Sequence, residues 1–305
     1  MKKIISLLSL LSSLTYADSL SDIAKKAHLA SINTLLIFTS QDALSSGTYH
    51  FTDVGVDMDI LHLPFTYHFP STDSLNYFIV GNIGYSKTYI TQTIQIPDGT
   101  RLNNKNHIRT YTAGLGGGIQ YKFSPQFYIS GGAELIYSKS GVSVLDPNNN
   151  IGDAIEDFFN QDYNDNLSYK FFTLAEYNML IFNNKAYAKI AYKIYETKST
   201  FDLSELSKFT SESSVTTLTL GVETDKLFEN SLNYLTLEPY VNANYLNGAV
   251  KNSVKFDYYA TLGVVAYWYT PKAPWWAQRF FLEASTVKSD GLDGYNIGLG
   301  FTLDF

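Results

Sequence analysis

From residue 32 onward, apolar and polar residues alternate with a period of two. The clearest example is residues 295–305, where every second side chain is apolar: Tyr295, Ile297, Leu299, Phe301, Leu303 and Phe305. The same alternation recurs in residues 127–138, 186–194 and 235–245. Because successive side chains of a β-strand point to opposite faces, this pattern predicts strands with one apolar and one polar face.

The connections between the predicted strands alternate in length. Five are tight, at residues 70–74, 124–126, 183–184, 228–231 and 271–277. Six are polar and mostly longer, at residues 41–49, 93–107, 144–167, 200–213, 247–252 and 288–293. Short turns at one end and longer loops at the other are typical of an up-and-down antiparallel transmembrane barrel. These eleven connections predict twelve strands, the first over residues 32–40.

The period alone does not decide which face meets lipid, because a secreted soluble barrel shows the same alternation. Charged residues make up only 17 % of the chain, whereas a soluble exterior carries Lys and Glu on most strands. Aromatic residues also gather beside the tight turns, as membrane-interface girdles do. The candidates are Phe123, Phe127, Trp268, Trp275, Trp276 and the terminal Phe305. We therefore predict an outer-membrane barrel, with a secreted soluble β-protein as the alternative.

The N-terminus has the three parts of a secretory signal. A basic start is followed by an apolar, Ser-rich run over residues 4–14 and by small residues up to Ala17. We expect cleavage after Ala17, which makes residues 1–17 a signal peptide. Residues 18–31 then form a short N-terminal helix, and residues 32–305 the barrel.

A short helix is marginal unless it packs on something. Glycines on the predicted lumen face offer a partner: Gly114, Gly116, Gly118, Gly132, Gly298 and Gly300. Glycine inside strands often marks the close approach of another backbone, so we predict that residues 18–31 lie in the lumen against this face. The alternative is that these glycines let the wall curve and that the helix stays in the periplasm.

Charged residues in mid-strand form the second candidate site. They fall on the predicted lumen face: Glu134, Glu176, Lys189, Lys193, Glu223, Glu238, Arg279 and Glu283. Paired across a narrow lumen, they would stabilise a filled barrel; unpaired, they would line a cation-preferring pore. Buried charges need partners, which favours the paired arrangement.

Other chemistry is poorly represented. The chain has no Cys, and its net charge of −7 without a long basic run argues against nucleic acid as a partner. Residues 144–167 carry six acidic residues and match calcium loops only loosely, so we interpret them as a solvated acidic loop. Asp57 and Asp59 share one strand face with His62 on the other, and no catalytic motif occurs. We therefore predict no enzyme, no cofactor and no metal site.

A helix followed by twelve strands resembles the translocator domain of autotransporters. Residues 59–69, 111–138 and 295–305 resemble the solitary autotransporter-like barrels of the outer membrane, and the resemblance covers nearly all of the mature chain. Autotransporters carry a long passenger, but only about a dozen residues separate Ala17 from the first predicted strand. Some also self-cleave at a helix Asn, which residues 18–31 lack. We therefore expect neither passenger secretion nor self-cleavage.

Together these features predict a narrow or helix-plugged pore for small solutes or ions in the outer membrane of a Gram-negative bacterium. A non-conducting structural or surface-interaction barrel is the alternative, and an outer-membrane hydrolase is a weaker one. The expected partners are outer-membrane lipid, lipopolysaccharide and the barrel-assembly machinery, which would recognise the last strand ending in Phe305.

Overall fold

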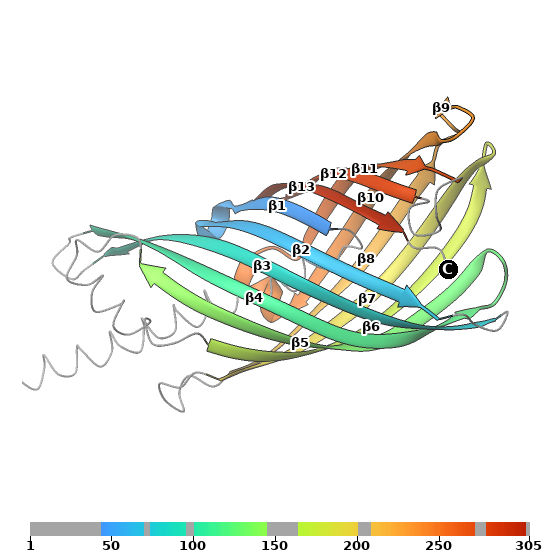
Figure 1. Ribbon diagram of the computed structural model, residues 1–305. Helices are drawn as coiled ribbons and strands as arrows, with labels where there is room; N and C mark the ends of the chain where they lie inside the picture. The colour runs from blue at the N-terminus through green and yellow to red at the C-terminus, as the bar shows by residue number, and fades with distance from the viewer. Residues whose placement is uncertain are drawn as a thin grey trace, which may run out of the picture.

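The computed structural model describes residues 44–69, 74–95, 101–144, 164–200, 209–271 and 279–302. They form a closed antiparallel barrel of twelve long strands (Figure 1). The predicted fold class and strand number are therefore confirmed. The predicted signal peptide (residues 1–17) and N-terminal helix (residues 18–31) lie outside the described residues.

The strands follow one another around the wall in chain order. They are β1 (Leu44–Phe51), β2 (Val56–His68), β3 (Leu75–Gln95), β4 (Arg101–Lys122), β5 (Phe127–Val144), β6 (Asn164–Ile181), β7 (Asn184–Thr200), β8 (Phe209–Glu223), β10 (Tyr234–Gly248), β11 (Tyr258–Tyr269), β12 (Arg279–Ser289) and β13 (Leu292–Thr302). β13 pairs with β1 and so closes the ring. The end where η1 (Thr52–Val54) joins β1 to β2 and α3 (Ala249–Val254) joins β10 to β11 is called the loop end. The opposite end, with the tight turns and the two-residue β9 (Phe228–Glu229), is the turn end.

The first strand is not where the sequence placed it. Most of residues 41–49, predicted as a loop, belong to β1, and the predicted strand at residues 32–40 lies outside the described residues. The prediction failed because β1 carries Ser45, Thr48 and His50 among few apolar residues, so its alternation is weak. The β1–β2 connection is instead a tight turn that ends at Gly55, whose φ of 64° favours glycine.

The wall is uneven in height. β3 and β4 have 21 and 22 residues, whereas β12 and β13 have 11 each. Most of the predicted loop at residues 93–107 continues these two long strands, and the predicted longer loop at residues 288–293 is a tight turn. Figure 1 accordingly shows β3 and β4 reaching well past β1 and β13 at the loop end.

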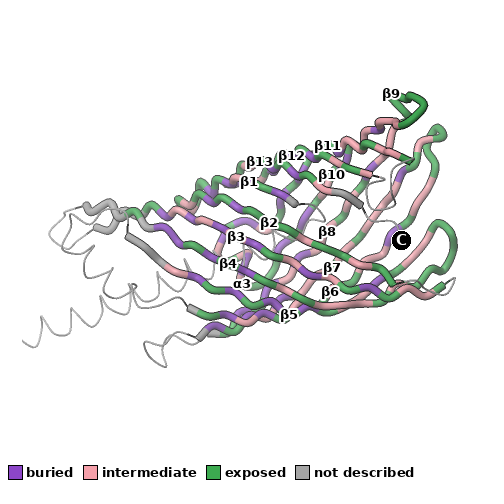
Figure 2. Tube along the Cα trace, in the orientation of Figure 1, coloured by how far each residue is buried: buried purple, intermediate pink, exposed green. Residues whose placement is uncertain are grey.

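The exterior of the barrel is apolar and its interior is polar. On β5, Ile129, Leu135 and Tyr137 are exposed, while Ser130 and Glu134 between them are buried. Figure 2 shows this alternation of buried and exposed positions along the strands. A soluble barrel has the opposite arrangement, so the outward apolar face indicates contact with lipid. Among the described helices, none is long and apolar enough to cross a bilayer.

Two rows of aromatic residues bound the outward apolar band. On three strands the rows are ten residues apart, at Tyr111 and Tyr121, Phe127 and Tyr137, and Tyr258 and Trp268. Ten residues at about 3.3 Å each, tilted by about 40°, span about 25 Å, which is the height of the apolar band of outer-membrane barrels. Phe123 lies in the turn-end row, 4.7 Å from the ring of Tyr121. Trp275, Trp276 and Phe305 lie outside the described residues.

Because the apolar face points outward, we expect a charged substitution on the exterior to lower the stability of the barrel. Leu115 lies in the middle of the outward band of β4 and is 62 % exposed. Leu115→Arg should destabilise the barrel in lipid vesicles by about 2–4 kcal/mol more than Leu115→Ala, because the guanidinium would sit in hydrocarbon. Urea unfolding of both variants measures this difference. Equal stabilities would contradict a lipid-facing exterior.

Candidate functional site in the barrel lumen

An apolar cluster crosses the lumen near the loop end. Its members are buried and come from nine strands, from α3 and from the residues after it: Tyr49, Phe51, Met58, Ile60, Ile136, Tyr195, Val215, Leu246, Val250, Val254, Phe256, Tyr259, Val287 and Leu292. β1 and β7, which carry Tyr49 and Tyr195, are six places apart in the ring of twelve and so lie on opposite walls. The cluster therefore spans the lumen from wall to wall.

The helix α3 supplies the part of this cluster that does not belong to the wall. The chain leaves β10 at Gly248, where φ is 77° and a Cβ would collide with the backbone of β8. Val250 and Val254, one helical turn apart, are both fully buried, and Ser213 on β8 accepts a hydrogen bond from the Val250 N–H at 3.1 Å. The six residues of α3 thus fold inward against the wall.

The sequence did not predict α3, because residues 247–252 resembled a polar loop. A signal was present, since Val250, Val254 and Phe256 are three large apolar residues in a connection otherwise rich in Asn, Lys and Ser. Such residues in a loop need a buried surface to cover them.

Beyond the apolar cluster, the lumen contains charged groups held by partners. Glu134 forms an ion pair with Lys170 at 2.8 Å and also accepts a hydrogen bond from Asn82. Glu176 forms a second ion pair with Lys189 at 3.2 Å. Lys170 was missing from the predicted set, although it follows the predicted loop at residues 144–167 and has the same strand parity as Glu176. The low dielectric of a protein interior makes such pairing necessary.

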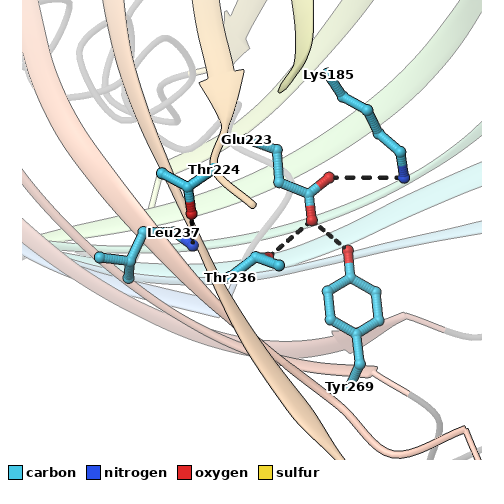
Figure 3. A network of polar contacts seen from close by, with 6 residues as sticks. All are labelled: Lys185, Glu223, Thr224, Thr236, Leu237 and Tyr269. Atoms are coloured by element: carbon cyan, nitrogen blue, oxygen red, sulfur yellow. Dashed lines mark hydrogen bonds and ion pairs between the residues drawn. The ribbon is translucent and has the colours of Figure 1, made fainter. Parts of the chain in front are cut away.

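A further network lies at the turn end, around Glu223 (Figure 3). Its carboxylate accepts hydrogen bonds from Thr236 at 2.7 Å and from the Tyr269 hydroxyl at 2.8 Å. Lys185 approaches to 3.9 Å, but its side chain is 81 % exposed, so this ion pair contributes little. The network links β7, β8, β10 and β11 across one side of the wall.

Tyrosine hydroxyls hold the other predicted glutamates. Tyr187 donates to Glu238 at 2.7 Å, and Tyr240 donates to Glu283. The guanidinium of Arg279 lies over the rings of Tyr267 and Tyr269, at 5.2 and 5.8 Å. Lys193 also has interaction partners. The sequence analysis did not pick out these tyrosines, because tyrosine occurs on both faces and only strand parity separates the two groups.

Close contacts between neighbouring strands of the wall explain why several of these lumen-facing positions are glycine. A Cβ on Gly116 or Gly118 would collide with backbone oxygens of β5, and one on Gly132 with the Gly117 oxygen of β4. A Cβ on Gly114 would meet Glu134 and Asn82, each at 2.5 Å, and one on Gly300 would meet the ring of Phe281. Contacts within the wall thus leave no room for a Cβ at these five positions. Gly298 also faces inward, and packing of residues 18–31 on this face stays a prediction because that segment lies outside the described residues.

The remaining candidate chemistry is dispersed. Asp57 and Asp59 are exposed on the outer face of β2, whereas His62 is buried in the lumen, so the structure keeps them on separate faces. His50 pairs with Asp57 at 2.8 Å on that outer face. Over the described residues, no three His, Asp or Glu side chains are placed to hold a metal ion. Residues 145–163 of the acidic loop lie outside the described part of the chain.

Comparison with known proteins gives matches in structure but not in sequence. No protein-family model and no curated protein matches the chain. The structure is similar to the beta domain of the Bordetella autotransporter BrkA, with a TM-score of 0.61 and 9 % identity over 86 % of this chain and 96 % of that one. The translocator domain of the autotransporter NalP from Neisseria meningitidis gives a TM-score of 0.55 and 11 % identity over 93 % of this chain and 98 % of that one.

The transport unit of the autotransporter AIDA-I from Escherichia coli gives a TM-score of 0.52 and 8 % identity, and the match covers 86 % of this chain and 88 % of that one. At such low identity these likenesses concern the fold. They agree with the resemblance found in the sequence, and they show that the chain has the same β-barrel fold as autotransporter translocator domains.

Proposed function

We propose that the chain is an outer-membrane protein whose lumen is a narrow pore for ions or small solutes, closed here by α3. The observation that carries this proposal is the apolar cluster that spans the lumen at one level, with polar and charged side chains towards the turn end. An apolar constriction blocks ions by excluding water, while a polar lining supports a hydrated path. A barrel with both elements is suited to gated conduction.

The position of α3, which we call the plug, would allow it to move out of the lumen. It is part of a connection and not of the wall, so displacing it breaks no strand pairing. Its packing depends on two valines and on a few contacts with β8 and β10. Lys251 and Asp257, which pair at 3.2 Å, are half-exposed and contribute little to holding it.

The proposed location is the outer membrane of a Gram-negative bacterium. The outward apolar band supports it, as does the signal peptide predicted for residues 1–17. We propose lipid, lipopolysaccharide and the barrel-assembly machinery as partners, the last through the strand that ends in Phe305. We assign no catalytic role, since Asp57 and Asp59 are separated from His62 by the wall.

A non-conducting structural barrel is the second candidate. The pairs of Glu134 with Lys170 and of Glu176 with Lys189 favour it, because charges that satisfy each other stabilise a filled lumen. The two candidates differ in what happens when the apolar cluster is weakened, since only a pore then conducts.

The first test weakens α3. In planar bilayers, the wild-type protein should be closed most of the time, and Val250→Ser/Val254→Ser should open about tenfold more often, because it removes apolar burial from the plug. Lys251→Gln on the same helix is the matched control and should behave as wild type. A second arm lacking residues 18–30 measures what the predicted N-terminal helix adds to the closure.

A folded double variant that stays silent would favour the structural barrel instead. Folding is checked by heat-modifiable migration on a gel, which depends on the intact barrel and not on conduction.

Selectivity gives an independent test. Glu238 has a phenol as partner, and over the described residues it forms no ion pair with Lys, Arg or His. In the opened background, Glu238→Gln should reduce the cation-to-anion permeability ratio by up to about fivefold, the effect of roughly 1 kcal/mol of lost charge attraction. Reversal potentials in a salt gradient measure this ratio. Glu196→Gln, on the outer face of β7, should leave the ratio unchanged, and an equal shift in both variants would exclude the lumen path.

A further inference from the structure

A row of cations lies directly beyond the loop-end tyrosine row on three neighbouring strands. Each cation is two residues from a tyrosine on the same outward face: Lys87 from Tyr85 on β3, Arg109 from Tyr111 on β4, and Lys139 from Tyr137 on β5. Two residues advance a strand by about 6.6 Å. The tilt of the strands therefore places the cations about 5 Å above the tyrosines along the barrel axis.

Two of these cations face each other across the strand pair. Lys87 is the direct register partner of Arg109, as Tyr85 is of Tyr111, whose rings are 5.1 Å apart. Like charges at directly opposed positions destabilise a sheet unless an anion lies between them. Over the described residues, neither Lys87 nor Arg109 forms an ion pair with a carboxylate.

The nearest acidic side chains are already engaged. Asp59 is the register partner of Lys87 on β2, but it accepts a hydrogen bond from Thr48 at 2.8 Å. Asp57 pairs with His50 at 2.8 Å. Over the described residues Asp59 forms no ion pair with Lys87, whose ammonium lies 4.6 Å from the centroid of the Tyr89 ring. Arg109 is exposed and has no carboxylate directly opposite it on either neighbouring strand.

Two outward-facing lysines on other walls are neutralised within the protein. Lys288 on β12 pairs with Asp293 at 3.0 Å, and Lys198 on β7 with Glu196 at 3.4 Å. On the tall wall of β3 and β4, Lys105 adds a further exposed cation nearer the loop end.

Below the tyrosines the same strands present aliphatic side chains to lipid. Ile83 and Leu115 are 60 % and 62 % exposed. From the loop end downward the surface therefore offers cations, then amphipathic rings, then hydrocarbon. A phosphorylated glycolipid has the same order of groups, with phosphate, sugar and acyl chain.

We propose that Lys87 and Arg109, together with Lys139, Tyr85 and Tyr111, form a binding site for the phosphate monoester of a glycolipid in the outer leaflet. Arg109 supplies the planar fork that matches phosphate oxygens, and Lys87 supplies a point charge. The bound phosphate removes the repulsion between the opposed cations. The site rests on the proposed outer-membrane location, but not on conduction.

The test uses the full chain folded in maltoside micelles, with lipid A as the probe. Native mass spectrometry counts the lipid A molecules retained as its concentration is varied. Lys87→Gln/Arg109→Gln should bind about tenfold more weakly, because it removes two charge-assisted contacts to phosphate. Lys288→Gln is the matched control, an outward cation at the same end, and should bind as wild type.

A second measurement compares the urea midpoint of one variant with that of wild type, and the difference should have opposite signs without and with lipid A. In uncharged micelles without lipid A, Arg109→Gln should raise the urea midpoint, because it removes the like-charge repulsion with Lys87 and its other register partner is Gly141. With lipid A present, the same substitution should lower the midpoint relative to wild type. The opposite results in either condition would overturn the site.

Other outcomes separate the sources of phosphate. Equal retention of dephosphorylated lipid A by wild type would overturn the phosphate site. Displacement of lipid A by millimolar inorganic phosphate would show a free-phosphate site and overturn the glycolipid assignment. Retention of lipid A by a barrel that never conducts would support this site while contradicting the proposed pore.

Discussion

Closure of the sheet is the constraint on which the rest of this structure depends. A bilayer offers no water to satisfy backbone N–H and C=O groups, so a strand in lipid must be paired along both edges. The eight residues of β1 meet this need, since they pair from Leu44 with Leu299 to Phe51 with Leu292 on one side and with β2 on the other. This seam turns an open sheet into a ring.

Closure then decides what the interior contains. The outward face must be apolar over about 25 Å, so the alternation of a strand sends the polar residues into the lumen. Charges in that confined space need partners, and the structure provides cations for Glu134 and Glu176 and phenols for Glu238 and Glu283. The apolar residues at the loop end of the lumen have no lipid to face. They are buried instead by α3, whose two valines complete the cluster.

The features that follow from alternation could be predicted from the sequence, and those that depend on tertiary contacts could not. Twelve strands and the inward charges of β5, β6 and β10 follow from a period of two. β1 was misplaced because its polar residues fall on both faces, and α3 was missed because six residues in a connection have too short a pattern to detect. Lys170 was missed because its importance comes from its place opposite Glu134 on β5, which depends on register. The tyrosine partners of the glutamates depend on register, which one sequence does not specify.

The proposed glycolipid site and the proposed plug of the lumen lie on different parts of the barrel wall. The tall strands β3 and β4 present the opposed cations Lys87 and Arg109 on the outer surface. The helix α3 connects β10 to β11 and packs against β8 and β10, on another part of the ring. Displacing α3 then leaves the lipid-facing lattice of β3 and β4 intact, because no strand pairing links the two. The proposed glycolipid site and the proposed opening of the lumen can therefore be altered independently within one closed sheet.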